Sequence, residues 1–476
     1  MPDPNQQGPM SWADLLNQFG GGAGGAGGSQ GPSAGGHRGG SEFEMLRTRF
    51  AQMSKKALVV LAVVILIIAA FCYWWFHPPI NIHSVDLWMF LAIFVLFPAF
   101  LVFFIFHQIY ERGMGKREKN EKKAKRFKGL MVVPVIIALV GVLGAVASLT
   151  LFPGNAEKYS TILNTEDGDF ATDIEQADYS TIPFIDRDSA VLLGNRTMGT
   201  MADYVSQFEI SDLYSQINYQ DAPVRVSPLN YADVFKWWWS NHDTGIPAYV
   251  IVNMSTQDTQ IVRLEDPIYY SDSDPFFNNV DRHVQLSHPF YIFGEKSFEI
   301  DDSGKPYWIY PVIDYTVGLF GGETVSRVVL CDASTGECQD LAIDEVPQWV
   351  DRAYPADLLI QQYNWSGALS GGWINSWLGQ SGVKQTTPGS DGQLGYNYIA
   401  KDDDVWVYSG VTSATADNSI IGFVLINQRT AESKFYPVAG ATEESAMSSA
   451  EGQVQNLKYE STFPLLINVD NQPTYF

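Results

Sequence analysis

The sequence predicts an α+β protein in which three transmembrane α-helices precede an extracytoplasmic domain of repeated antiparallel β-meander units with packed helices. Three observations predict this fold. The first 154 residues contain three apolar stretches, the charge of the chain changes sign near Gly154, and a strand-turn-strand pattern recurs three times beyond it. We therefore expect a tail, three membrane spans and a large acidic domain, in that order.

Residues 1–54 are rich in glycine, with runs such as GGGAGGAGG, and such a composition cannot bury a core. We expect a disordered cytoplasmic tail that acts as a tether. The exception is SWADLLNQF at 11–19, whose apolar residues would share one side of a helical turn. This segment is either a chance apolar patch or a docking motif for a cytoplasmic partner.

Three stretches meet the requirement of about 20 consecutive apolar residues for crossing a bilayer. They are 57–76, 87–110 and 130–152. The first two predict a transmembrane helical hairpin over 55–110, and the third predicts a single transmembrane helix over 130–153.

The loop at 111–129 carries nine basic residues, and positively charged loops stay in the cytoplasm. This charge predicts a cytoplasmic N-terminus and an extracytoplasmic domain over 154–476, in a multi-pass protein of the cell membrane. The small residues at 145–147 also resemble a signal-peptide cleavage site, although the surrounding apolar stretch is too long for a signal core. Gly141, Gly144, Ala145 and Ser148 suit close packing against the other helices instead.

The charge of the chain is divided unevenly. Up to Gly154 there are 14 Lys and Arg against 8 Asp and Glu, whereas the remainder carries 16 against 45. An acidic surface repels nucleic acid, so we expect no nucleic-acid partner. The expected partners are the lipid bilayer and an envelope protein or polymer. Roughly 320 residues exceed what one core usually holds, which favours subdomains or repeats.

The acidic part contains three copies of one pattern, at 249–264, 328–343 and 423–438. Each copy has a β-rich run, an Asn or Asp, a Thr three residues later, an acidic residue two after that, and a second strand. The equivalent residues are Asn253, Asp332 and Asn427, then Thr256, Thr335 and Thr430, then Asp258, Glu337 and Glu432. This pattern predicts a β-hairpin whose turn is capped by side chains.

The similarity extends upstream, where 306–330 parallels 405–425 and a fainter match begins at Ala222. Trp308 and Trp406 then hold equivalent places. The natural unit is a four-strand meander with alternating apolar residues facing a helix.

Helices fit the intervening segments 346–363 and 442–456. A further alignment pairs 298–309 with 465–476, so the chain ends where another unit would begin. We expect either a truncated polypeptide or a terminal strand that pairs with something outside the chain, because a bare edge strand is an aggregation liability.

The two cysteines of the acidic part occupy positions that should face each other across the middle hairpin. Cys331 and Cys338 replace Val252 and Thr259 of the first copy. A disulfide there is plausible outside the cytoplasm and would add ~2 kcal/mol. The alternative is a pair of free thiols in a reducing niche.

The turn sequence DASTGE at 332–337 resembles that of PepSY-type repeats found in bacterial envelope proteins. The strings at 306–322 and 345–367 are also similar to uncharacterised membrane proteins of Gram-positive bacteria. The resemblance covers 220–476 and implies a binding or regulatory ectodomain.

No motif for chemistry is found. The sequence has no Gly-x-Ser-x-Gly elbow and no phosphate-binding loop followed by Lys and Ser or Thr. His283 and His288 lack a third metal ligand, and the acidic run at 402–404 does not fit a twelve-residue calcium loop. We expect no catalytic residue, no cofactor and no metal site.

Aromatic residues are the more informative surplus. They form two groups, Trp237, Trp238 and Trp239 in the first and Trp365, Trp373 and Trp377 in the second. Such residues either contact a ligand or partner, or fill the core between a sheet and its helix.

The expected function is that of a membrane-anchored extracytoplasmic protein that binds, regulates or scaffolds another envelope component without catalysis. One alternative is a cell-wall or peptide hydrolase that uses residues such as Asp274 and His283. The other is an accessory subunit of a transport or secretion complex.

Overall fold

The computed structural model describes residues 55–97, 135–177, 182–389, 394–413 and 419–476. The chain divides into two compact units, Met1–Val64 and Ile65–Phe476, and the packing described below lies within the second. Three predicted features lie outside the described residues: the tail at 1–54, the SWADLLNQF segment and the basic loop at 111–129.

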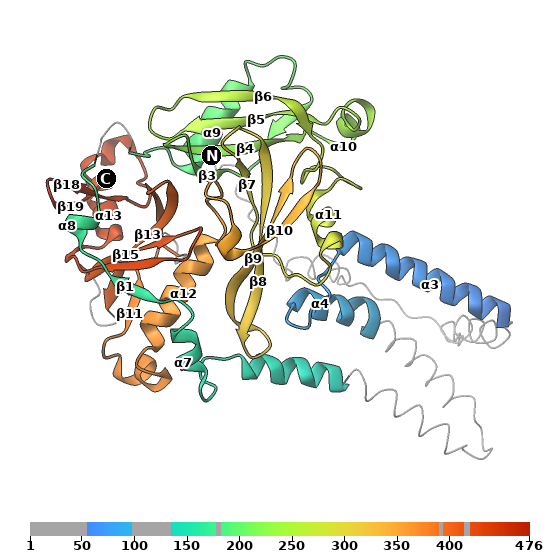
Figure 1. The fold of residues 1–476 in the computed structure, drawn as a ribbon, viewed down its shortest axis with the longest axis horizontal. Helices are drawn as coiled ribbons and strands as arrows, with labels where there is room; N and C mark the ends of the chain where they lie inside the picture. Colours follow the sequence, from blue (N-terminus) through green and yellow to red (C-terminus); the bar gives the residue numbers. More distant parts are fainter. Residues whose placement is uncertain (1–54, 98–134, 178–181, 390–393, 414–418) are drawn as a thin grey trace, which may run out of the picture. The chain divides into compact units, whose positions relative to one another are not determined.

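The second unit is α+β, and its described strands form three large sheets (Figure 1). The first contains β2 (Phe208–Ile210), β3 (Ser215–Tyr219), β4 (Ala222–Tyr231), β5 (Ile246–Asn253) and β6 (Thr259–Ile268). The second contains β7 (Ser297–Ile300), β8 (Pro306–Val317), β9 (Gly321–Asp332) and β10 (Cys338–Ala342). The third contains β1 (Thr165–Asp167), β11 (Lys384–Thr386), β12 (Asn397–Lys401), β13 (Asp404–Ser413), β15 (Gly422–Asn427) and β16 (Ser433–Tyr436). Two-stranded sheets pair β14 (Ser419–Ile420) with β17 (Gly440–Ala441) and β18 (Leu466–Val469) with β19 (Gln472–Tyr475).

Each large sheet contains one antiparallel meander of four strands. The meanders are β3-β4-β5-β6, β7-β8-β9-β10 and β12-β13-β15-β16. The β18-β19 hairpin corresponds to the first half of such a unit, as the alignment of 298–309 with 465–476 predicts. The predicted four-strand unit is therefore present three times.

The second hairpin of each meander has the same turn chemistry. The Asn or Asp oxygen accepts hydrogen bonds of 2.8 to 3.0 Å from the N–H groups two and three residues on, in the turns after Asn253, Asp332 and Asn427. The Thr oxygen accepts one of 3.2 to 3.3 Å from the N–H of the acidic residue, at Thr256, Thr335 and Thr430. The residue between them has a positive φ, which is 65° at Gln257, 73° at Gly336 and 59° at Ala431. Side-chain caps thus hold the turn even where glycine is absent.

The predicted register across these hairpins is also confirmed. Val252 lies opposite Thr259, and Cys331 lies opposite Cys338. The two sulfurs are bonded, with a Cα–Cα separation of 4.1 Å.

The predicted equivalence of Trp308 and Trp406 is wrong by one residue. Trp406 lies opposite Asn427, whereas Trp308 lies opposite Cys331, one residue before Asp332. Successive side chains of a strand point to opposite faces, so this shift places the two indoles on opposite faces of their units. The register of β8 against β9 is set by the turn between these strands and by the irregularity at Val312 and Ile313, which a sequence match does not resolve.

The α12 helix (Ala356–Leu369) contacts both the second and the third sheet. Its buried Leu359 and Tyr363 share one core with Val328 of β9 and Val424 of β15. The predicted start at 346 is wrong, because Pro355 prevents the preceding residue from adopting helical geometry. The α13 helix (Glu443–Gln453) begins as predicted, with the Thr442 hydroxyl accepting from the Ser445 N–H at 3.3 Å.

The described residues contain seven further α-helices. They are α3 (Lys55–Phe76), α4 (Val85–Phe90), α7 (Asn155–Ser160), α8 (Phe170–Asp173), α9 (Arg187–Met198), α10 (Val234–Lys236) and α11 (Val280–Ser287). Single π-helical turns are η1 (Leu91–Leu96), η2 (Trp237–Asn241) and η4 (Asn375–Gly379), and single 3₁₀ turns are η3 (Ile343–Glu345) and η6 (Gln455–Leu457).

The prediction of three transmembrane helices is wrong for the part of the chain that the structure describes, where no helix is long and apolar enough to cross a membrane. In the second stretch, six α-helical residues of α4 are followed by six π-helical residues of η1. The third stretch is helical over 135–147 and then continues as turns.

The predicted topology depended on those spans. The multi-pass membrane location, the cytoplasmic N-terminus and the extracytoplasmic placement of 154–476 are therefore not supported. Two of the close-packing residues have a different role from the predicted one. A side chain at Gly144 would overlap Leu319, and the Ser148 hydroxyl accepts from the N–H groups of Leu319 and Phe320 at 2.8 Å each. These two residues pack against the β8-β9 turn, whereas Gly141 faces Trp88 of α4 as predicted.

Candidate functional site

Three hairpins, β3-β4, β12-β13 and β18-β19, each have a tight turn with polar tip residues. The tips are Gln220-Asp221, Asp402-Asp403 and Asp470-Asn471, and all six residues have φ between 51° and 62°. Two consecutive residues in this conformation make the type I′ turn that matches the twist of paired strands. Asp and Asn tolerate the conformation, so the turn itself places acidic side chains at the hairpin tips.

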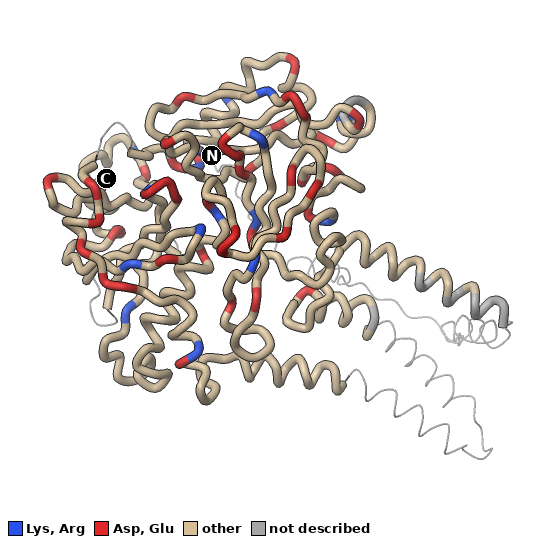
Figure 2. The backbone as a smooth tube through the Cα atoms, viewed as in Figure 1, with Lys and Arg blue, Asp and Glu red and all other residues tan. Residues whose placement is uncertain are grey.

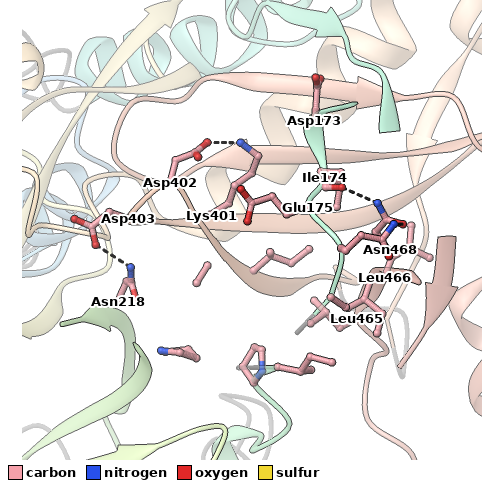
Figure 3. A pocket seen from close by; sticks show the side chains of 18 of the residues that line it. Asp173, Ile174, Glu175, Asn218, Lys401, Asp402, Asp403, Leu465, Leu466 and Asn468 are labelled. Atoms are coloured by element: carbon pink, nitrogen blue, oxygen red, sulfur yellow. Dashed lines mark hydrogen bonds and ion pairs between the residues drawn. The ribbon is translucent and has the colours of Figure 1, made fainter. Parts of the chain in front are cut away.

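Asp221 and the Asp402-Asp403 tip line a cavity of about 760 Å³, which we call the hairpin pocket (Figure 3). Its lining residues come from the segment before α9, from two hairpins and from β18. They are 172–177, Ile182, Pro183, Asn218, Asp221, Pro223, 399–403, Lys434 and 465–468. A volume of this size is within the range of small-molecule and peptide-side-chain sites, roughly 300–1,000 Å³.

The hairpin pocket carries more negative than positive charge. Five carboxylates line it, from Asp173, Glu175, Asp221, Asp402 and Asp403. Its two ammonium groups are already paired, since Lys401 binds Asp402 and Lys434 lies 3.1 Å from a Glu432 oxygen. Figure 2 shows the same acidic excess along the whole of this unit.

Asp403 is the central carboxylate. Its oxygens accept hydrogen bonds from the Asn218 amide at 2.9 Å and the Gln348 amide at 3.3 Å. Burial and then the charges of Asp221, Asp404 and other carboxylates raise the pKa of Asp403. A cation next to Asp403 would relieve this repulsion.

A buried polar layer holds the hairpins in place behind the pocket. The Asn218 N–H donates to Asp351 at 2.6 Å, and the Asp351 N–H donates to Glu299 at 2.8 Å. Both carboxyl groups are almost fully buried, and burial raises the pKa of each. The layer connects β3, β7 and the loop after β10, which are far apart in the sequence.

On the other side, β18 is fixed by the segment before α9. The Asn468 amide donates to the Ile174 carbonyl at 2.7 Å, and the Ala177 N–H donates to the Asn468 carbonyl at 2.8 Å (Figure 3). The hairpin pocket is therefore assembled from segments of separate repeat units that lie far apart in the sequence.

The first tryptophan group does not line the hairpin pocket. Trp237 is half-buried, and its indole N–H donates to Asp274 at 2.8 Å. Trp238 and Trp239 are 60% and 80% exposed. Trp237 thus stabilises the fold, and the expected contact role of the other two stays a prediction.

The second group divides in the same way. Trp365 packs edge-on against Tyr159, with ring centroids 4.8 Å apart. Trp373 and Trp377 stack on each other at 6.0 Å, and Trp377 is 67% exposed. None of the three lines the hairpin pocket.

The disulfide lies beside a histidine. The ligand atoms of His283, Cys331 and Cys338 lie within 4.8 Å of one another. The His283 Nε2 is already hydrogen-bonded to the Gly336 carbonyl at 2.7 Å, and the sulfurs are bonded to each other. While the disulfide is closed, these groups do not offer a thiolate set for a metal.

The residues expected for a hydrolase have structural partners. Asp274 accepts from the N–H groups of Phe276 at 2.8 Å and Asn278 at 3.2 Å, in addition to Trp237, and so holds a turn. His283 bonds to a backbone carbonyl, and the two side chains are not hydrogen-bonded to each other.

A nearby ionic cluster was not predicted from the sequence. Lys296 lies 2.5 Å from an Asp272 oxygen and 2.7 Å from an Asp281 oxygen, and the Tyr310 hydroxyl donates to Asp281 at 2.7 Å. Burial opposes the charge of Lys296, yet the two carboxylates raise its pKa. The ammonium is fully paired, so it is not available as a base or a nucleophile.

Comparisons with known proteins do not assign the chain to a family. No protein-family model matches the chain, and no curated protein matches it. Among solved structures, the chain is similar to the YpeB C-terminal domain of Bacillus megaterium, at 11% identity over 55% of this chain and 99% of that one, with a TM-score of 0.13. A TM-score this low does not establish a shared fold, so the resemblance to PepSY-type repeats stays a prediction.

Proposed function

We propose that this chain is a non-catalytic binding module that takes a positively charged segment of a partner protein into the hairpin pocket. The observation that carries the proposal is the cavity of about 760 Å³ formed where the hairpin tips of separate repeats meet. A scaffold of rigid sheets with a cavity between turn tips is a common arrangement for binding.

The charge of the pocket indicates the class of ligand. Glu175 and Asp221 have no ion-pair partner among the described residues, and Asp403 is held only by amide groups. A lysine or arginine side chain would supply the missing positive charge. Nucleic acid and acidic polymers would be repelled by the same carboxylates.

The proposal is tested with the full chain and two labelled peptides of equal length, one rich in lysine and one rich in glutamate. We expect fluorescence anisotropy to show binding of the basic peptide, and we expect this binding to weaken as salt increases. The double variant Asp221→Asn, Asp403→Asn should bind the basic peptide about fivefold more weakly or worse, because it removes two attractive charges.

The matched control is Glu265→Gln, which neutralises an exposed carboxylate on β6 outside the pocket. It should leave the affinity within twofold. The proposal is rejected if neither peptide binds, if the acidic peptide binds equally well, or if Glu265→Gln weakens binding as much as the pocket variant.

A further inference from the structure

A second cavity of about 310 Å³ lies beside the hairpin pocket, and we call it the Arg225 pocket. Its walls are largely aromatic, with Phe184, Tyr396, Tyr398, Phe463 and Phe476 among the lining residues. One cationic side chain, Arg225 of β4, also lines it. Aromatic walls with a single charged group are typical of sites for small organic ions.

Arg225 is buried with too few partners. It is 7% exposed, and its one hydrogen bond to another described side chain runs from Nη2 to the Gln216 oxygen at 3.2 Å. Its Nε has no hydrogen-bond partner among the described residues, and neither has the Gln216 amide nitrogen. A guanidinium has five N–H donors, so most of its hydrogen-bonding capacity is unused.

The surrounding charges neutralise Arg225 only in part. Tyr398 and Asp186, which also line the pocket, favour the charged form of Arg225, whereas Arg352 and Arg187 oppose it. Asp186 is also engaged at the start of α9, where it accepts from the Ser189 N–H at 2.8 Å. Burial lowers the pKa of Arg225 to about 10, so the side chain still carries its charge at neutral pH. A buried charge without a full set of partners costs stability, which an anion in the cavity would offset.

We propose that the Arg225 pocket binds a small organic carboxylate with an aromatic or aliphatic body. The guanidinium would pair with the carboxylate through two parallel N–H···O bonds, and the aromatic walls would contact the body. The carboxylate could belong to a free acid or to the C-terminal residue of a peptide. The inference is independent of the function proposed for the hairpin pocket, whose ligand carries the opposite charge.

The test uses the full chain and isothermal titration calorimetry. The probes are 3-phenylpropionate, its neutral amide, the dipeptide Gly-Phe and the C-terminally amidated Gly-Phe. We expect 3-phenylpropionate to bind at least tenfold more tightly than its amide, because the two differ in the charged group alone. Binding of Gly-Phe but not of its amidated form would assign the carboxylate to peptide C-termini, and binding of 3-phenylpropionate alone would assign it to free acids.

Two variants separate recognition from folding. Arg225→Met keeps most of the volume and removes the unpaired charge, so it should fold at least as stably and lose binding tenfold or more. Arg225→Lys keeps the charge without the planar fork and should bind with intermediate affinity. The control Arg196→Met removes an exposed guanidinium near the other end of α9 and should leave the affinity within twofold.

The inference is overturned if each acid binds no better than its amide, if none of the four probes binds, or if Arg225→Met binds 3-phenylpropionate as the native chain does. If Arg225→Met fails to fold, Arg225→Lys provides the test. Undiminished binding of 3-phenylpropionate by the lysine variant would exclude bidentate recognition by Arg225. The Asp221→Asn, Asp403→Asn variant should bind 3-phenylpropionate normally, which keeps this result distinct from that of the hairpin pocket.

Discussion

The equivalent turn residues Asn427 and Asn253 should differ in their contribution to stability, and the difference can be worked out from their contacts. The Asn427 oxygen accepts from the N–H groups of Arg429 at 2.8 Å and Thr430 at 2.9 Å, and its amide donates to Asp404 at 2.8 Å. Asn427 is 2% exposed. Two neutral hydrogen bonds contribute ~1 kcal/mol each, and one to a charged group contributes ~1.5–3 kcal/mol. Asn427→Ala should therefore lose roughly 4 kcal/mol.

Asn253 makes the two turn hydrogen bonds without a buried charged partner, and it is partly exposed. Asn253→Ala should lose roughly 1–2 kcal/mol. The assay is urea unfolding of the full chain followed by tryptophan fluorescence, with the slope of the transition compared between variants to detect a loss of cooperativity.

A third variant separates the turn from the charge. Asn427→Asp keeps both acceptor bonds but replaces the amide donor with a carboxylate facing Asp404. It should be destabilised at pH 7 and should recover at low pH, where one of the two carboxyl groups is protonated. Equal losses for Asn427→Ala and Asn253→Ala, or an Asn427→Asp variant as stable as the native chain at pH 7, would refute the reasoning.

Three further predictions concern single side chains. Burial raises the pKa of Asp351, so its contribution to stability is present below the ordinary carboxyl range and is lost as pH rises through the folded pKa. Asp351→Asn should raise the urea midpoint in alkaline buffer and flatten the fall of the midpoint above the ordinary carboxyl range, and an unchanged slope would count against this. Cys338→Ser opens the hairpin disulfide and should cost roughly 2 kcal/mol in the same assay, with dithiothreitol lowering the midpoint of the native chain but not of the variant. Gly336→Ala should lower the free energy of unfolding by roughly 1–3 kcal/mol, because φ is 73° and the added methyl would overlap Tyr270. Ala431→Gly at the equivalent position should be neutral or stabilising. Equal effects of the two substitutions would contradict the role of the positive φ.

The second hairpins could be predicted from the sequence because their turns depend on local contacts. The Asn or Asp, the Thr and the acidic residue all lie within six positions. The Asn or Asp and Thr side chains accept from N–H groups of the same turn, and the acidic residue supplies the N–H that bonds to the Thr hydroxyl. A short pattern that repeats three times therefore predicted a three-dimensional feature and its register. The Trp308 error shows the limit of the same method, since turns and strand irregularities such as that at Val312 and Ile313 set the register, and a sequence match does not resolve them.

The apolar stretches gave the opposite result. Hydropathy alone predicted three spans, yet α4 continues as a π-helical turn and Ser148 is bonded to the β8-β9 turn. A run of apolar residues indicates that a segment avoids water, but it does not determine how long the regular α-helix is. The two cavities were not predicted at all, because Asn218, Asp403 and Asn468 are brought together only by the packing of separate units.

The repeats share the chemistry of their turns and differ in the partners of the capping residue. The capping position is Asn253, Asp332 and Asn427 in the three copies, and each copy satisfies the turn in the same way. Within its own unit, Asp332 pairs with Lys305 at 2.5 Å, whereas Asn427 donates to Asp404. The hairpin pocket and the Arg225 pocket, in contrast, take their lining residues from more than one unit. Binding and stability should therefore respond to different substitutions, with the caps controlling stability and the facing side chains controlling what the cavities accept.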